Sequence, residues 1–154
     1  CMQERTRGLR GTRVRGMGRR GLRKRFRALG AIGAHRGVAV GIVRFGDRRV
    51  RVLSVHGLHV RTVGRARQDA FYWLLTAWVR RMTAKGHLWV VAGDFNRKHT
   101  DLAALLGGQS IGQGVDGIVV SPGLDIDAIR IDRTGIERGW TDHPAIVANV
   151  RLRR

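Results

Sequence analysis

The stretch "VVAGDFNRK", residues 90–98, decides how the chain is interpreted, because it sets polar residues directly after an apolar run. The run extends back to His87, and its near-continuous apolar character predicts a central strand buried on both faces. Asp94 and Asn96 follow Gly93 at the point where this strand ends. An aspartate and an asparagine beside a glycine form ordinary turns, and they also occur at the mouths of active sites. The rest of the chain decides between these two interpretations.

Upstream of this strand, the sequence predicts a hairpin and a helix. Residues 37–46 and 48–57 are β-rich runs that meet at Gly46 and Asp47, which is typical of a hairpin turn. Between residues 65 and 85, apolar side chains recur at three- and four-residue steps, and Gly86 stands where a helix would end. The apolar stripe of this predicted helix consists of Phe71, Leu74, Leu75, Trp78, Val79 and Met82.

Downstream, "TDLAALLG" predicts a short helix that Thr100 would cap. Three further strands are predicted in "VDGIVVSP", "LDIDAIRID" and "PAIVANVRL". Strands combined with a helical crossover indicate a layered fold of the α/β (α+β) class.

Positive charge is concentrated in the first third of the chain. The 154 residues carry a net charge of +19, and residues 1–51 contribute +14 of it. Residues 5–30 alternate Arg with Gly and contain one aromatic residue, Phe26, which is typical of a basic loop or arm. Nucleic acid is the favoured partner, because each neutralised phosphate releases counterions. An arginine-biased genome also raises such counts, and this composition is typical of a GC-rich bacterium or its phage.

The remaining composition excludes several classes of protein. The length is that of one domain, and 43% hydrophobic residues suffice for a core. Cys1 is the one cysteine, which excludes an internal disulfide and Cys-based zinc sites. No apolar stretch approaches the ~20 residues that cross a bilayer, and no segment resembles a secretion signal. We therefore expect no membrane partner and an intracellular, cytoplasmic setting, with the oligomeric state left open.

Polar residues, most of them capable of acid–base chemistry, stand at the ends of four predicted strands. They are His56, Asp94, Asn96, Asp116, Asp142 and His143. Because strand ends meet along the rim of a sheet, we expect these side chains to gather there. Phosphodiester hydrolysis needs such a set: carboxylates for a hard cation, a base for water and an acid for the leaving oxygen.

The motifs around these residues resemble the endonuclease/exonuclease/phosphatase superfamily, which has the DNase I-like fold. "VVAGDFN" resembles its GDFN signature, and "TDHPAIVANV" resembles its closing Ser/Thr-Asp-His strand. "VDGIVVSP" resembles its aspartate-bearing strand and "VLSVHGLHV" its histidine-bearing strand. The four motifs occur in the family's order over about residues 38–154. The resemblance implies a DNase I-like four-layer β-sandwich flanked by helices.

The opening "CMQERTRG" extends this resemblance, because "MQE" matches the family's Gln-Glu motif. The family's first strand, which precedes this motif, has no counterpart here, so we expect the fold to lack that strand and to leave a sheet edge unpaired. Two regions are predicted: residues 1–36, with the Gln-Glu motif and the basic arm, and residues 37–154, as a single core domain.

The resemblance also implies roles around the phosphate. Glu4 and Asp142 would hold a divalent ion, Mg²⁺ or Mn²⁺, while Asp94 and Asn96 would orient the attacking water and the phosphate. The residues expected to bind nucleic acid are Arg19, Arg20, Arg23, Lys24, Arg25, Arg97 and Lys98.

Two histidines complete the implied site. Asp116 would accept a hydrogen bond from His143, which would act as a base or a phosphate ligand. His56 would contact the scissile phosphate or assist the leaving group, and His59 is an alternative match for it. The glutamate that pairs with the strand histidine in DNase I-like members has no counterpart here, so another partner or the phosphate itself would serve.

The sequence therefore predicts a divalent-metal-dependent phosphodiesterase, a nuclease that hydrolyses DNA. One alternative is a non-catalytic nucleic-acid-binding module on a degenerate nuclease scaffold. The other is a phosphatase or phosphodiesterase of the same superfamily that acts on a phosphoester other than nucleic acid. The choices between DNA and RNA, and between endonuclease and exonuclease action, stay open.

Overall fold

The computed structural model describes residues 38–45 and 47–153, without the side chain of Phe45. Several predicted features lie outside the described residues: the Gln-Glu motif, the basic arm and the turn residue Gly46. The site residues among them are Glu4, Arg19, Arg20, Arg23, Lys24 and Arg25.

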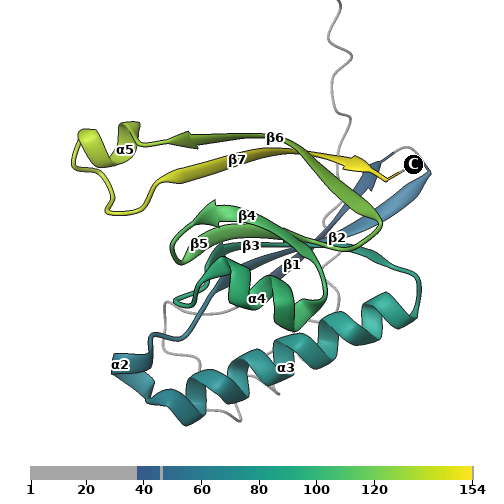
Figure 1. Cartoon of the computed structure of the whole chain (residues 1–154), viewed down its shortest axis with the longest axis horizontal. Helices are drawn as coiled ribbons and strands as arrows, with labels where there is room; N and C mark the ends of the chain where they lie inside the picture. The colour runs from purple at the N-terminus through teal and green to yellow at the C-terminus, as the bar shows by residue number, and fades with distance from the viewer. Residues whose placement is uncertain (1–37, 46, 154) are drawn as a thin grey trace, which may run out of the picture.

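A five-stranded sheet with the order β1-β2-β3-β5-β4 forms the centre of the fold (Figure 1). The antiparallel hairpin of β1 (Val38–Phe45) and β2 (Arg48–His56) confirms the prediction. β3 (Leu88–Asp94) lies in the middle of the sheet, as its apolar run predicted, and it pairs parallel with β2. β5 (Asp116–Val120) pairs antiparallel with β3, and the unpredicted β4 (Gln109–Gln113) closes the edge.

The crossover between the parallel strands consists of two helices. α2 (Val60–Val63) is a single turn, and α3 (Arg65–Ala84) is the predicted long helix. Gly86 follows the end of α3 with a φ of 68°, so the predicted glycine stop is confirmed. The predicted stripe packs against the sheet, with Phe71 1% exposed and Val79 fully buried, while the side chains of Leu74 and Trp78 are half-buried.

The short helix α4 (His99–Leu106) corrects one detail of the prediction. Thr100 lies inside the first turn, and Lys98 takes the N-cap position without a side-chain capping bond. The helix begins earlier because the backbone N–H of His99 donates to the carbonyl oxygen of Gly114, at 3.2 Å, which orders the chain before Thr100.

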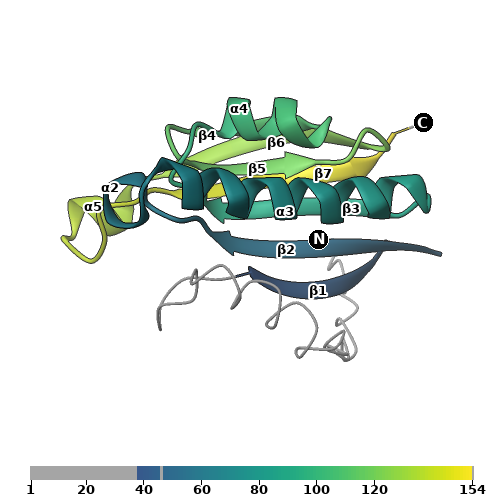
Figure 2. The same ribbon diagram turned by 90° about the horizontal axis from the view of Figure 1, so that it is seen from below.

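The last two strands form a separate sheet. β6 (Leu124–Asp132) and β7 (Ala145–Leu152) pair antiparallel, and the single-turn α5 (Thr134–Glu137) lies in the connection between them. Figures 1 and 2 show this pair stacked over one face of the five-stranded sheet, with α3 and α4 on the other face.

Two apolar clusters hold these layers together. The larger lies between the helices and the five-stranded sheet, where Leu53, Trp89 and Val91 are fully buried. The smaller, with Val120 and Leu124, joins the two sheets. Both faces of the strands are therefore covered, as the sequence predicted for β3.

The described residues thus form a helical layer and two sheets of the predicted α+β class. Within them, β1 and β4 are the edges of the five-stranded sheet. Apolar side chains of the two-stranded sheet remain exposed, including Ile129 at 41% and Val147 at 45%. The absence of the family's first strand stays a prediction, because residues 1–37 are not described. No described helix is long and apolar enough to cross a membrane.

Candidate active site

The backbone register brings three of the predicted site residues into one row. His56, the last residue of β2, pairs with Asp94 on β3, and Asp94 pairs with Asp116 on β5. Residues that are directly opposite on neighbouring strands project from the same face of a sheet. The strand-end pattern of the sequence therefore produces one continuous rim of an imidazole and two carboxylates.

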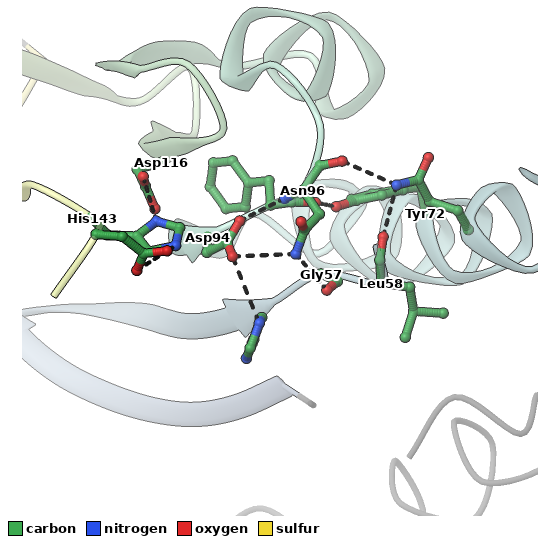
Figure 3. A network of polar contacts seen from close by, with 11 residues as sticks. Gly57, Leu58, Tyr72, Asp94, Asn96, Asp116 and His143 are labelled. Atoms are coloured by element: carbon green, nitrogen blue, oxygen red, sulfur yellow. Dashed lines mark hydrogen bonds and ion pairs between the residues drawn. The ribbon is translucent and has the colours of Figure 1, made fainter. Parts of the chain in front are cut away.

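His143 reaches this rim from the connection before β7. Its Nδ1 donates to the Oδ2 of Asp116 at 2.8 Å, which is the contact that the resemblance implied (Figure 3). This hydrogen bond raises the pKa of His143, partial burial opposes the rise, and the charges of Asp116, Asp94 and Asp142 add to it. The side chain of His143 is 42% exposed, so the imidazole remains open to a ligand.

The loop after β3 contains the turn that the sequence offered as the ordinary interpretation of Asp94 and Asn96. Asp94 Oδ1 accepts the backbone N–H of Asn96 at 2.8 Å, which is an Asx turn, and Asn96 adopts a left-handed φ of 49°. The side-chain Nδ2 of Asn96 donates to Asp94 Oδ2 at 3.2 Å and to the carbonyl oxygen of Gly57 at 3.1 Å. Both amide hydrogens of Asn96 are therefore engaged in holding Asp94 and the adjacent loop.

Asp94 also provides the carboxylate that the sequence did not supply for His56. The Nε2 of His56 lies 3.6 Å from Asp94 Oδ2. His56 is 45% exposed and Asp94 21% exposed, so the pair borders solvent. His59, the alternative histidine, lies at the N-cap of α2.

Two residues of α3 that the sequence analysis missed hold the loops that follow β2 and β3. Gln68, 2% exposed, donates from Nε2 to the carbonyl oxygens of Leu58 at 2.7 Å and Asn96 at 3.0 Å. The hydroxyl of Tyr72 donates to the carbonyl oxygen of Phe95 (Figure 3). Burial raises the pKa of Tyr72, with Arg97 opposing, so it remains a donor. Their spacing of four residues, in phase with the predicted stripe, was the signal that could have found them.

The glycines at this rim permit the close approach of the two loops. A Cβ on Gly57 would collide with the carbonyl oxygen of Phe95 and the hydroxyl of Tyr72. Gly93 has a φ of 138°, and a Cβ there would collide with the carbonyl oxygen of Val55. The glycine that opens the GDFN stretch is therefore required by the backbone on which Asp94 stands.

A hollow of about 190 Å³ lies beside the two carboxylates. It is lined by Ala92, Gly93, Asp94, Asp116, Gly117, Ile118, Pro144 and Ile146. Its polar side is formed by Asp94 and Asp116, and its other walls belong to β3, β5 and the start of β7. A small charged group that enters it would contact both carboxylates and apolar side chains.

The described residues do not by themselves fit a metal ion. No three His, Cys, Asp or Glu side chains group as a metal site over the described ranges 38–45 and 47–153. The side chain of Asp142 is 94% exposed, and its Oδ1 lies 3.5 Å from His143 Nε2. The other expected ligand, Glu4, lies outside the described residues.

Of the basic residues expected to bind nucleic acid, Arg97 and Lys98 are described. The guanidinium of Arg97 lies 3.7 Å from Asp69 Oδ1 and 5.3 Å from the centroid of the Tyr72 ring. Arg97 is 26% exposed, whereas Lys98 is an exposed side chain at the start of α4. Both immediately follow Asn96, so they lie next to the rim.

Comparison with known proteins identifies the fold. No family model and no curated protein matches the sequence. Among solved structures, the chain is similar to a humanized TDP2 from D. rerio that carries 14 mutations, with a TM-score of 0.58 and 14% identity. The similarity covers 80% of this chain and 62% of that one, so this chain spans less than two thirds of the TDP2 chain. At this identity the likeness shows the fold alone, and the predicted DNase I-like fold is confirmed.

Proposed function

We propose that the chain is a phosphodiesterase of the DNase I-like superfamily that hydrolyses nucleic acid. The observation that carries this proposal is the convergence of His56, Asp94 and Asp116 in one row, with His143 bonded to its end. A fold alone does not imply a function, whereas imidazoles and carboxylates gathered at one rim supply proton donors and acceptors for hydrolysis.

In the proposed reaction, each group has one task. The bond from His143 Nδ1 to Asp116 orients the ring and leaves Nε2, which lies 3.5 Å from Asp142 Oδ1, as its second nitrogen. The raised pKa of His143 favours the charged imidazolium, which donates from Nε2 to a phosphoryl oxygen. Asp94 orients the attacking water and accepts its proton as the bond from oxygen to phosphorus forms. His56 gives a proton to the leaving oxygen as its bond to phosphorus breaks. Asn96 acts through Asp94, because its amide holds that carboxylate.

The substrate class follows from charge. The net charge of +19 favours a polyanion over a small phosphoester, and Arg97 and Lys98 stand beside the rim. We propose DNA as the substrate, with residues 1–36 as the Gln-Glu motif followed by the basic arm, and residues 37–154 as the catalytic domain. Mg²⁺ or Mn²⁺ is the proposed cofactor, with Glu4 and Asp142 as its ligands, because the charge on the phosphoryl oxygens must be neutralised.

A plasmid-nicking assay tests the proposal. Supercoiled DNA is incubated with the whole chain in Mg²⁺, in Mn²⁺ and with EDTA. The same assay is run with Asp94→Asn and with the matched control Asp101→Asn, which alters an exposed aspartate in the first turn of α4. We expect nicking by the unaltered chain, its loss in EDTA, and a decrease of about 10²-fold or more for Asp94→Asn alone.

Three outcomes would contradict parts of the proposal. Equal nicking by both variants would indicate a contaminating nuclease. Nicking that persists in EDTA would exclude the cofactor. Binding of DNA by a chain that cuts in none of these conditions would favour the non-catalytic binding module.

A further inference from the structure

The connection that carries His143 also carries an exposed tryptophan. Trp140 is 72% exposed, one of two tryptophans with such exposure in the described chain, and the other is Trp73 on α3 at 70%. The guanidinium of Arg138 lies 4.9 Å from the centroid of the Trp140 ring. One face of the indole is thus occupied by a cation, which leaves the other face available to a flat ligand.

The backbone around Trp140 is held in place. The N–H of Trp140 donates to the carbonyl oxygen of Gly135 at 2.8 Å, and the N–H of Gly139 donates to Ile136 at 2.9 Å. The hydroxyl of Thr141 accepts the N–H of His143 at 3.1 Å. An indole on such a hydrogen-bonded connection loses little conformational entropy when a ligand stacks on it.

Trp140 lies within reach of a strand bound at His143. The two residues are three positions apart, so their Cα atoms are separated by at most about 11 Å. Figures 1 and 2 both show α5 at the same end of the molecule as α2, which follows the site strand β2. Along a nucleic-acid strand, a distance of about 10 Å spans only a few nucleotides at about 3.4 Å each.

We propose that Trp140, backed by Arg138, stacks on an unpaired base next to the phosphate bound at His143. The proposal rests on the proposed function and specifies its substrate class: single-stranded or locally unpaired nucleic acid. An unpaired base exposes its π-face, whereas a base inside a duplex has both faces covered by its neighbours. The guanidinium beside the indole favours a base of an anionic strand over an apolar protein partner, because the same cation attracts the phosphates of that strand.

Binding without turnover provides the test. Anisotropy of a labelled oligothymidine is measured in EDTA with the whole chain, and again with a strand of equal length whose phosphates are joined by abasic linkers. The variants are Trp140→Ala, Trp140→Phe and the matched control Trp73→Ala. Circular dichroism melts check that each variant is folded.

We expect Trp140→Ala to raise the Kd for oligothymidine about tenfold and to leave the Kd for the abasic strand within about twofold. Trp140→Phe should restore part of the loss, and Trp73→Ala should leave both affinities unchanged. Equal effects of Trp140→Ala on both strands would overturn the stacking, as would no effect on either. Because no cleavage is measured, failure of the hydrolase proposal and failure of base stacking are distinguishable.

Discussion

Replacement of Gln68 by methionine tests how firmly α3 holds the two loops of the site. Methionine fills a similar volume but donates no hydrogen bond. The carbonyl oxygen of Leu58, a residue 2% exposed, would lose its hydrogen bond from Gln68. The carbonyl oxygen of Asn96 would lose the other hydrogen bond that Gln68 donates. The structure therefore predicts a loss of stability together with a loss of loop positioning.

The magnitude follows from the surroundings of the two carbonyl groups. A buried acceptor left without a donor costs about 1–3 kcal/mol, which applies at Leu58. Asn96 is half-buried, so water can replace the bond there and the net loss is about 1 kcal/mol. We expect Gln68→Met to lower the free energy of unfolding by about 2–4 kcal/mol and Tm by about 5–15 °C.

Urea unfolding followed by circular dichroism measures this change. Gln109→Met, at an exposed position of β4, makes the same chemical change away from the site and should stay within about 0.5 kcal/mol of the unaltered chain. Gln68→Glu provides a second variant for the same measurement. A carboxylate that faces two carbonyl oxygens has a raised pKa. The stability of this variant should therefore recover as the pH falls and the carboxylate is protonated. A loss below about 0.5 kcal/mol for Gln68→Met would refute the reasoning.

Three further predictions concern the rim and its surroundings. Asp116→Asn should lower the pKa of His143, which an NMR titration measures. The raised pKa stabilises the fold below the ordinary pKa of the imidazole, and this stabilisation is lost as the pH rises through the raised pKa. The variant should therefore be more destabilised at pH 6 than at pH 9, and an equal loss of stability at both pH values would contradict this. Gly57→Ala should destabilise the fold by more than about 1 kcal/mol in urea unfolding, because its Cβ meets the carbonyl oxygen of Phe95; an unchanged midpoint would count against the described packing of the loops. Arg97→Gln should reduce the slope of log K for DNA binding against log salt concentration by about 1, while the free energy of unfolding changes by less than about 1 kcal/mol. An unchanged slope would show that Arg97 contacts no phosphate.

The long elements of the fold could be predicted because their patterns are strong. The period of α3 and the apolar run of β3 each span enough residues to determine element type. β4 could not be found, because "QSIGQ" (residues 109–113) alternates weakly and owes its strand conformation to pairing with β5. α2 and α5 are single turns, too short to show a helical period.

The residues that meet at the rim could be predicted from the sequence, whereas the residues that support them could not. Strand ends identified His56, Asp94 and Asp116, because a strand ending in a polar residue exposes that residue at a rim. Gln68 was missed because a polar residue on a core-facing stripe is normally interpreted as an interruption, and only the neighbouring carbonyl groups reveal its purpose. The roles of these residues, and everything assigned to Glu4 and the basic arm, stay predictions.

The pairing of His56, Asp94 and Asp116 across neighbouring strands has a consequence for how this scaffold tolerates change. Their mutual spacing is fixed by the hydrogen-bond ladder, so connections that carry no site residue, such as the one between α3 and β3, can change length without altering it. A one-residue insertion within β3 would instead rotate Asp94 to the opposite face of the sheet. Natural diversification and laboratory redesign of substrate choice should therefore concentrate in the connections, with the strand ends held constant.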